Sequence, residues 1–226
     1  MADELSCTFC GKFFRRESTL QVHNCEQKKR FFQKNDPGVQ IGFQTYLRFF
    51  ELTQGTSKLK THEDFSTSPY YTAFVKFGKH IKKINAVAPA LFIDWIIKQN
   101  KKLDKWCRDD MYEEFLHNYL RKEKAEEAIE RFVEFTVEWG IENDAEFNHV
   151  FWLGNENKIC YYITLGKISP WALYNCDTGI KFLEELNEEQ VQYIFKWIDP
   201  SYWQRHFIDY MADTELIKKA LSDGGF

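Results

Sequence analysis

A chain of 226 residues that is 44% hydrophobic, with 21 Phe, 11 Tyr and 7 Trp, can form one sizeable domain beside a small module. It has no apolar run near the roughly 18 residues of a membrane-spanning helix, and its first residues lack the basic-then-apolar pattern of a signal peptide, so we expect a soluble, cytoplasmic protein without a membrane partner. The net charge of −4 is uneven, because residues 1–105 hold 18 Lys and Arg against 10 Asp and Glu, whereas residues 106–226 hold 12 against 24.

Four residues with metal-ligating side chains stand close to the start of the chain. Cys7 and Cys10 are separated by two residues, and twelve further residues lead to His23 and then Cys25. Two thiols at this spacing can lie on one side of a hairpin turn, and an imidazole and a third thiol complete the tetrahedron that Zn²⁺ prefers in structural sites. The pattern therefore predicts a module over residues 1–30 with one structural Zn²⁺, bound by Cys7, Cys10, His23 and Cys25.

Cys25 has an alternative to the role of fourth ligand. Cys25 can instead be a reduced surface thiol, with water or a partner completing the site. A disulfide framework is disfavoured, because Cys107, Cys160 and Cys176 are scattered without framework spacing, as is typical of proteins in a reducing cytosol.

Apolar residues around the ligands indicate how such a module folds. Leu5, Phe14 and Leu20 can form a small core, which metal binding must complete because so few side chains are available. Gly11 follows the second thiol, where a permissive backbone is favoured. The stretch 7–25 resembles the C2H2 zinc-finger family through Cys7, Cys10, Phe14, Leu20 and His23. This resemblance covers the module alone and implies a small ββα fold.

The end of the motif departs from that family, which places three to five residues between its last two ligands. Here Asn24 alone separates His23 from Cys25. Because positions i and i+2 lie roughly 200° apart on a helix, both side chains cannot reach one metal from a regular helix. We therefore expect the helix to break at His23, with Asn24 in the turn.

The resemblance also implies where the module would contact DNA. The base-reading positions of the family fall on Arg16, Thr19 and Val22, of which Arg16 suits a guanine edge and Val22 cannot hydrogen-bond a base. One finger covers about three base pairs, too few for specific binding alone. Neighbouring basic residues can hold phosphates, so the expected nucleic-acid site comprises Arg15, Arg16, Thr19, Lys28, Lys29 and Arg30. Protein docking and a purely structural role are the open alternatives.

After a basic hinge at residues 31–37, helical spacing runs through almost the whole chain. Val39, Phe43, Tyr46 and Phe50 recur on one face of a first helix. Capping residues, prolines and glycines delimit further expected helices at 70–84, 90–99, 109–121, 125–140, 144–153, 179–186, 187–198, 201–211 and 213–223. We therefore predict a mainly α fold, in which a small ββα zinc finger precedes an irregular all-α helical domain over 38–226, with a further boundary near 105.

The uneven charge suggests that the two halves meet different partners. The basic half is the better candidate to bind nucleic acid, and the acidic half to bind a protein. Lys76, Lys79 and Lys83 share one helical face and can extend a phosphate track from the finger. Alternatively, these lysines are simply the solvent-exposed face of a helix, with no ligand.

Only one pattern is typical of an enzyme. Glu114 with His117 and Glu146 with His149 are both Glu-x-x-His, the ligand pair of di-iron helical bundles. The helices between them look too short for such a site. A phosphate-binding glycine loop, a His-Glu-x-x-His motif and a nucleophile elbow are all missing from the sequence. We therefore expect no catalysis and no small-molecule substrate.

A second, broader resemblance comes from the segments 23–30, 35–55 and 65–80. Together they look like proteins of large T-even-like tailed phages of marine hosts, which pair such a finger with a helical domain. The function we expect is a non-catalytic zinc-finger adaptor that binds nucleic acid, a protein partner or both, in phage replication or transcription within the host cytoplasm. The alternative is a virion or tail and baseplate assembly component in which zinc is only structural.

Overall fold

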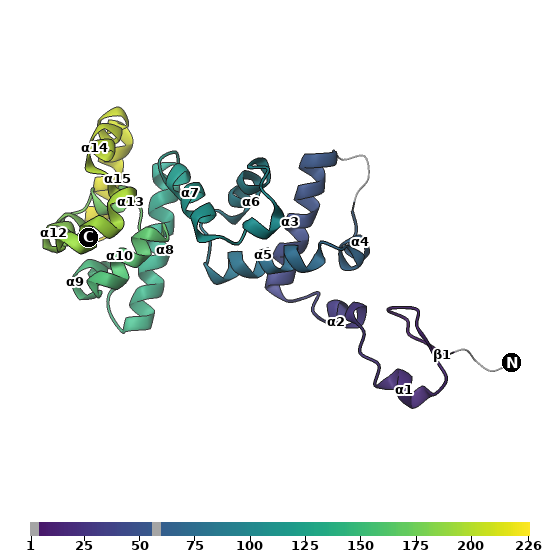
Figure 1. Cartoon of the computed structure of the whole chain (residues 1–226). Coiled ribbons are helices and arrows are strands. Elements are labelled where there is room, and N and C mark those ends of the chain that lie inside the picture. Colours follow the sequence, from purple (N-terminus) through teal and green to yellow (C-terminus); the bar gives the residue numbers. More distant parts are fainter. Residues whose placement is uncertain (1–4, 56–59) are drawn as a thin grey trace. The chain divides into compact units, whose positions relative to one another are not determined.

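The computed structural model describes residues 5–55 and 60–226, so the first four residues of the predicted finger lie outside the described residues. The predicted fold class is confirmed, since the described chain is mainly helical and carries a two-stranded sheet near its N-terminus (Figure 1). It divides into two compact units, Met1–Met111 and Tyr112–Phe226. None of the described helices combines the length and the apolar character needed to cross a membrane.

The N-terminal unit begins with a small ββα arrangement. Strands β1 (Leu5–Ser6) and β2 (Phe13–Phe14) pair antiparallel, with Leu5 opposite Phe14. The turn between them is closed by the Gly11 N–H, which donates to the Cys7 carbonyl over 2.8 Å. Gly11 has a φ of +71°, which explains why glycine stands there. Two short helices follow, α1 (Glu17–Gln21) and α2 (Glu26–Phe32).

The predicted hinge at 31–37 is partly helical, because α2 extends to Phe32 and the next helix begins at Pro37. The rest of this unit consists of α3 (Pro37–Gln54), α4 (His62–Thr67), α5 (Tyr71–Lys83), α6 (Pro89–Lys98) and a short 3₁₀ turn, η1 (Leu103–Lys105). Asp36 starts α3, since its carboxylate accepts the N–H groups of Gly38 and Val39. The core of the unit is aromatic and contains the fully buried Phe65, Phe74, Phe77, Phe92 and Trp106.

Helices α3 and α5 cross closely, as Figure 1 shows. Three glycines make this approach possible. A Cβ on Gly78 would lie 2.1 Å from the carbonyl oxygen of Gly38 and 2.5 Å from the amide nitrogen of Gly42. The crossing therefore depends on bare backbone at these positions.

The C-terminal unit contains most of α7 (Asp109–Leu120), inside which the division falls, and a series of mostly short helices. They are α8 (Ala125–Asn143), η2 (Phe147–His149), α9 (Val150–Leu153), α10 (Glu156–Thr164), α11 (Pro170–Leu173), α12 (Asp177–Glu185), α13 (Glu188–Ile198), α14 (Pro200–Asp209) and α15 (Met211–Asp223). The capping box of Asn187 and Gln190 is present at the start of α13. Apolar side chains including Leu116, Phe132, Trp171 and Trp203 are almost fully buried.

Two helix starts predicted in this unit are wrong. Asp144 does not open a helix but ends α8, in the left-handed conformation with a φ of 52°. Asp213 lies inside α15, which begins at Met211 directly after a bend at Tyr210. An acidic residue that terminates a helix and one that starts it look alike locally, because Asp favours both turns and N-caps.

Candidate metal centre

The four predicted ligands come from separate short elements of the N-terminal module. Cys7 directly follows β1 and is buried, and Cys10 lies in the turn that leads to β2. His23 follows α1, and Cys25 is the N-cap residue of α2. The strand pairing and the two helix ends therefore bring one face of the hairpin to the segment between α1 and α2.

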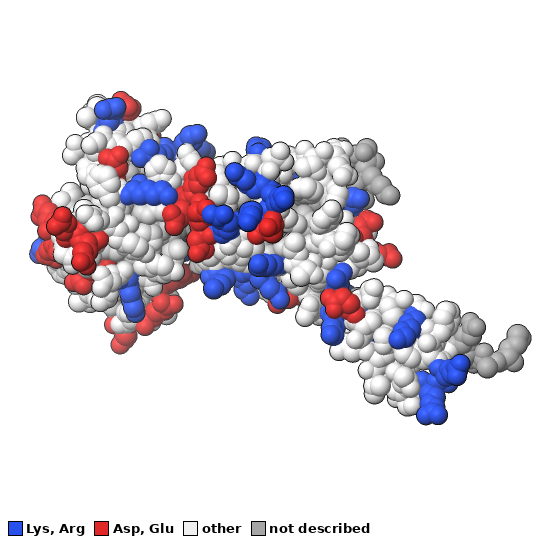
Figure 2. Space-filling model, viewed as in Figure 1, with Lys and Arg blue, Asp and Glu red and all other residues white. Residues whose placement is uncertain are grey.

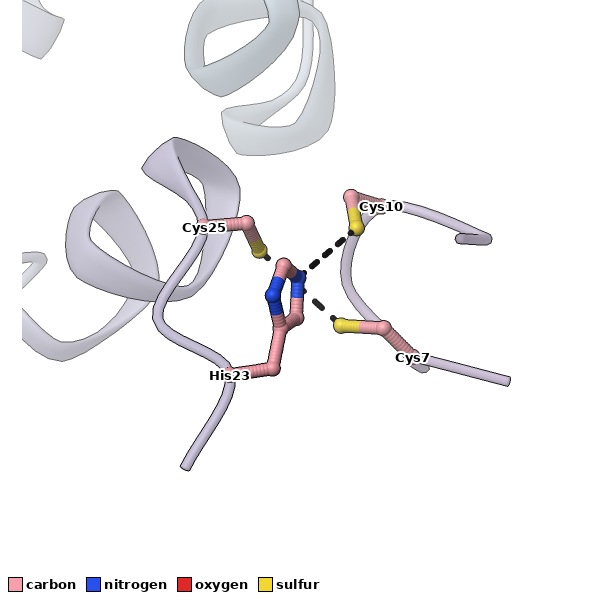
Figure 3. A group of neighbouring side chains, drawn as sticks. All are labelled: Cys7, Cys10, His23 and Cys25. Carbon is pink, nitrogen blue, oxygen red and sulfur yellow. Dashed lines mark hydrogen bonds between the residues drawn. The ribbon is translucent and has the colours of Figure 1, made fainter. Parts of the chain in front are cut away.

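The ligand atoms form a compact group, drawn in Figure 3. Cys10 Sγ lies 3.3 Å from His23 Nε2, and Cys7 Sγ lies 3.9 Å from Cys25 Sγ. All four ligand atoms lie within 4.8 Å of one another. With zinc–sulfur bonds of about 2.3 Å and zinc–nitrogen bonds of about 2.0 Å, tetrahedral ligand atoms lie about 3.5–3.8 Å apart. The group can therefore hold one metal ion.

The backbone between the helices explains how His23 and Cys25 can face one centre. Helix α1 ends at Gln21, so the expected break is present and comes before His23. Cys25 has extended backbone, with φ −83° and ψ 165°. Side chains two residues apart lie on the same side of an extended chain, unlike those on a helix. With Asn24 alone between them, His23 and Cys25 can therefore face one centre from an extended segment.

Two of the sulfurs accept hydrogen bonds from backbone N–H groups. Cys25 Sγ accepts the Lys28 N–H over 3.4 Å at the positive end of α2. Burial raises the pKa of the Cys7 thiol, but hydrogen bonds from the backbone of Cys10 and Phe9 leave that pKa below its ordinary value. Because the thiolate is the form that ligates metals, the lowered pKa of Cys7 favours binding of a cation.

Aromatic contacts support the module on two sides. The rings of Phe14 and His23 lie 4.7 Å apart between centroids, which holds the imidazole beside β2. Phe9, in the hairpin turn, meets Phe31 and Phe32 at 5.2 and 6.2 Å. The last two residues belong to α2, so the folded module extends to Phe32. Phe31 and Phe32, the last two residues of α2, were predicted to lie in the hinge, although two adjacent aromatic residues were a signal of packing.

The residues predicted to bind nucleic acid are not equivalent in the structure. Arg15, Arg16, Thr19 and Lys29 are exposed. Lys28 Nζ instead donates to the His23 carbonyl over 3.3 Å, so it lies beside the metal centre.

Arg30 connects the module to the helical part of the unit. Its Nη1 donates to the Ser66 carbonyl over 2.7 Å, and its guanidinium lies 4.3 Å from the ring centroid of Tyr71. Nε also meets the Glu26 carboxylate at 3.2 Å. With three partners, the Arg30 guanidinium has an intramolecular role that the basic run Lys28–Arg30 did not reveal.

No second metal-binding group of three or more Cys, His, Asp or Glu side chains occurs within residues 5–55 and 60–226. Glu146 and His149 approach one another only to 3.9 Å, and neither Glu-x-x-His pair belongs to a larger group. Compared with known proteins, the chain matches no protein-family model, no curated protein and no solved structure.

Proposed function

We propose that Cys7, Cys10, His23 and Cys25 bind one structural Zn²⁺, and that the module folded by this ion binds nucleic acid as part of a non-catalytic adaptor. The observation that supports it is the convergence of the four donor atoms within 4.8 Å. Three sulfurs and one imidazole nitrogen are donors that Zn²⁺ takes in structural sites, and four protein ligands leave no open position for catalysis.

A structural role for the ion agrees with the small core of the module. Among residues 5–36, Cys7 alone is buried, and neither α1 nor α2 contains a buried residue. So little burial cannot offset the conformational entropy of ordering this segment. Metal binding would therefore supply most of the folding free energy of the module, as in other small metal-nucleated domains.

Exposed basic side chains support nucleic acid as the partner of the module. Arg15 and Arg16 lie at the start of α1, and Lys29 lies on α2. On the face shown in Figure 2, further Lys and Arg side chains gather over the N-terminal unit, and Asp and Glu side chains over the C-terminal unit. Contacts between such side chains and the phosphate backbone of a nucleic acid give affinity without sequence preference.

The acidic C-terminal unit is the proposed protein-binding part of the adaptor. Its helix α8 exposes Val133, Val137 and Ile141, which follow one another at four-residue spacing, and Ile141 is 79% exposed. Glu130 and Glu134 flank this row on the same helix. An apolar row between carboxylates suits a basic amphipathic segment of another protein.

Metal analysis and DNA titration test the proposal. Protein prepared without chelator should contain one zinc ion per chain and bind a short mixed-sequence duplex in fluorescence anisotropy. Replacing Arg15, Arg16 and Lys29 by Ala should flatten the slope of log affinity against log salt by about 0.9 per lost phosphate contact. Zinc without any salt-sensitive binding would favour the alternative of an assembly component with structural zinc. Protein without zinc would reject the proposal.

A further inference from the structure

Three phenylalanine rings form one aromatic patch at the end of α2. Phe31 and Phe32 lie 5.7 Å apart between ring centroids and contact Phe9 of the hairpin turn at 5.2 and 6.2 Å. Phe32 is 69% exposed, and Phe31 is exposed as well. A contiguous apolar surface that the folded module leaves in water is typical of an interaction site.

Phe13 is a further exposed ring of the same module. Its neighbour on β2, Phe14, contacts His23, so the alternation of the strand turns Phe13 to the opposite face. Phe13 is accordingly 65% exposed. Lys12 and Arg15, both exposed, flank it in the sequence. An aromatic ring in water thus stands among basic side chains.

The module is basic as a whole. Residues 5–35 hold seven Lys and Arg against two Asp and Glu. Zinc bound by three thiolates and a neutral imidazole would remove only one of these positive charges, since the thiolates outweigh the two charges of the ion by one. Lys34 Nζ lies 4.4 Å from the ring centroid of Phe31, which brings an ammonium to the aromatic patch. Such a surface complements a partner that carries both negative charge and aromatic groups.

The helix that would read paired bases is poorly equipped to do so. Helix α1 comprises only Glu17–Gln21, begins with an acidic residue and contains no basic one. Gln21 donates to the Glu17 carboxylate over 3.3 Å, and Val22 lies beyond the end of the helix. Reading base edges in the major groove requires hydrogen-bonding side chains along a helix. Unpaired bases, in contrast, can stack their faces on exposed rings.

We propose that the module binds an unpaired strand of nucleic acid, with one base stacked on Phe32, another on Phe13, and phosphates held by the basic side chains beside each ring. This inference rests on the proposed nucleic-acid function and names the form of nucleic acid that the module takes. DNA and RNA share the required chemistry, because every base has an aromatic face. Comparing a ribonucleotide strand with a deoxyribonucleotide strand of the same sequence distinguishes them, the tighter being the form that the module favours.

Fluorescence anisotropy of the zinc-loaded full chain with matched probes tests the proposal. The probes are a strand of about twelve nucleotides without self-complementarity, the same strand paired in a duplex, and an abasic strand with the same number of phosphates. The unpaired strand should bind about tenfold more tightly than the abasic strand, because stacking adds to the phosphate contacts, and more tightly than the duplex. Equal, salt-sensitive binding of all three would overturn this inference and leave the proposed function standing. Absence of binding to every probe would overturn both.

Substitutions at the two rings separate stacking from apolar packing. Phe32→Leu and Phe13→Leu keep an apolar side chain without an aromatic face, so each should weaken binding of the unpaired strand about fivefold. Their affinity for the abasic strand should not change. Phe32→Trp, which has a larger ring, should bind the unpaired strand at least as tightly as the wild type. The matched control is Phe195→Leu, at an exposed ring on α13 of the C-terminal unit, which should leave binding unchanged.

Zinc content and circular dichroism melting establish that each variant is folded. If Phe32→Leu loses its zinc because the contact with Phe9 is needed for folding, Phe13→Leu against Phe195→Leu decides. Full-strength binding of the unpaired strand by both leucine variants would overturn the proposal and would favour a protein partner for the aromatic patch.

Discussion

Cys25 combines two roles in one sulfur atom. It belongs to the group of four side chains that could hold a metal ion, and it also accepts the Lys28 N–H at the start of α2. A ligand at a helix N-cap links metal binding to the formation of that helix. Asn24 precedes it on the segment that joins the two helices, where a local departure from helix is required.

Cys25→Ser separates these two roles. Serine is a good N-cap and keeps the helix start, but its hydroxyl is a poor substitute for a thiolate ligand. We expect zinc affinity, measured by competition with a chromophoric chelator, to fall by more than about 100-fold, since even outer partners of metal ligands contribute 10–100-fold. Cys107→Ser, which lies outside the group, should change nothing. Unchanged affinity in Cys25→Ser would mean that water or another group supplies the fourth ligand.

Glu123 is the most deeply buried carboxylate among the described ion pairs. Its side chain is fully buried, lies 2.6 Å from Arg131 and accepts the Ser169 hydroxyl over 2.7 Å. Burial raises the pKa of Glu123 above its ordinary value, and Arg131 only partly opposes this. Without the Glu123 carboxylate, Arg131 and Ser169 would each lose a partner.

Removing Glu123 should therefore destabilise the C-terminal unit strongly. We expect Glu123→Ala to lower the free energy of unfolding by about 3–5 kcal/mol, because the Arg131 guanidinium loses its carboxylate partner at a site where it is mostly buried. Glu123→Gln keeps a hydrogen-bond acceptor and should cost less. The control is Glu127→Ala, an exposed residue of the same region, which should change stability by less than about 0.5 kcal/mol. Urea unfolding followed by tryptophan fluorescence measures all three, and a loss in Glu123→Ala as small as the control would refute the argument.

At the scale of elements, helix starts marked by a proline were predictable. Pro69 lies two residues before α5 and Pro89 is the first residue of α6, and both helices begin within one residue of the expected starts. Such signals are local, because they depend on a few adjacent φ and ψ values. The group of four candidate ligands was predictable for a similar reason, since their spacing alone restricts the chain.

Contacts between distant segments were not predictable in this way. Lys98 lies four residues after Asp94 on the same helix, yet the hydrogen-bonded partner of Asp94 is Arg48 on α3. Phe31 and Phe32, at the end of α2, were predicted to lie in the hinge, because their contacts with Phe9 form only when the hairpin is folded. In both cases the decisive neighbour lies far away in sequence, where periodicity carries no information.

The crossing of α3 and α5 gives a prediction in which two effects oppose one another. Alanine is favoured over glycine inside a helix by about 1 kcal/mol, but a Cβ on Gly78 would meet backbone atoms at 2.1 and 2.5 Å. Backbone cannot move aside as a flexible side chain can, so the steric term should dominate. We expect Gly78→Ala to destabilise the N-terminal unit by about 1–3 kcal/mol.

Gly224→Ala is the control for this substitution. The nearest atoms to a Cβ at Gly224 lie at 3.4 Å, an ordinary contact distance. Thermal unfolding should show a lower transition for Gly78→Ala and little change for Gly224→Ala. Equal or raised stability in Gly78→Ala would show that helix propensity prevails and that the crossing can open without cost.

At the scale of the whole molecule, the N-terminal module and the helical part of the same unit are stabilised by different means. The module has a single buried residue, Cys7, among residues 5–36, whereas the helices that follow enclose an aromatic core. Arg30 joins the two parts through the Ser66 carbonyl and the Tyr71 ring. Metal removal should therefore act on one part of the molecule and spare the other.

We expect a strong chelator to unfold the module while the remaining helices persist. Far-ultraviolet circular dichroism should lose only a small fraction of its helical signal, because α1 and α2 are short. Limited proteolysis should then cut within residues 5–36, where basic residues such as Arg15, Arg16 and Lys29 offer trypsin sites in a segment no longer held by metal. Adding Zn²⁺ back should restore resistance.

Arg30→Ala distinguishes loss of the metal from loss of the connection. This variant should keep its zinc, because Arg30 contacts none of the four ligands in the described structure, yet its module should be cut faster than that of Lys29→Ala, whose side chain is exposed. The expected order of resistance is zinc-loaded wild type and Lys29→Ala, then Arg30→Ala, then chelated protein. Chelation that leaves the cleavage pattern unchanged would mean that apolar contacts such as Phe9 with Phe31 hold the module without an ion. Global unfolding on chelation would mean instead that the aromatic core of the helices depends on the module.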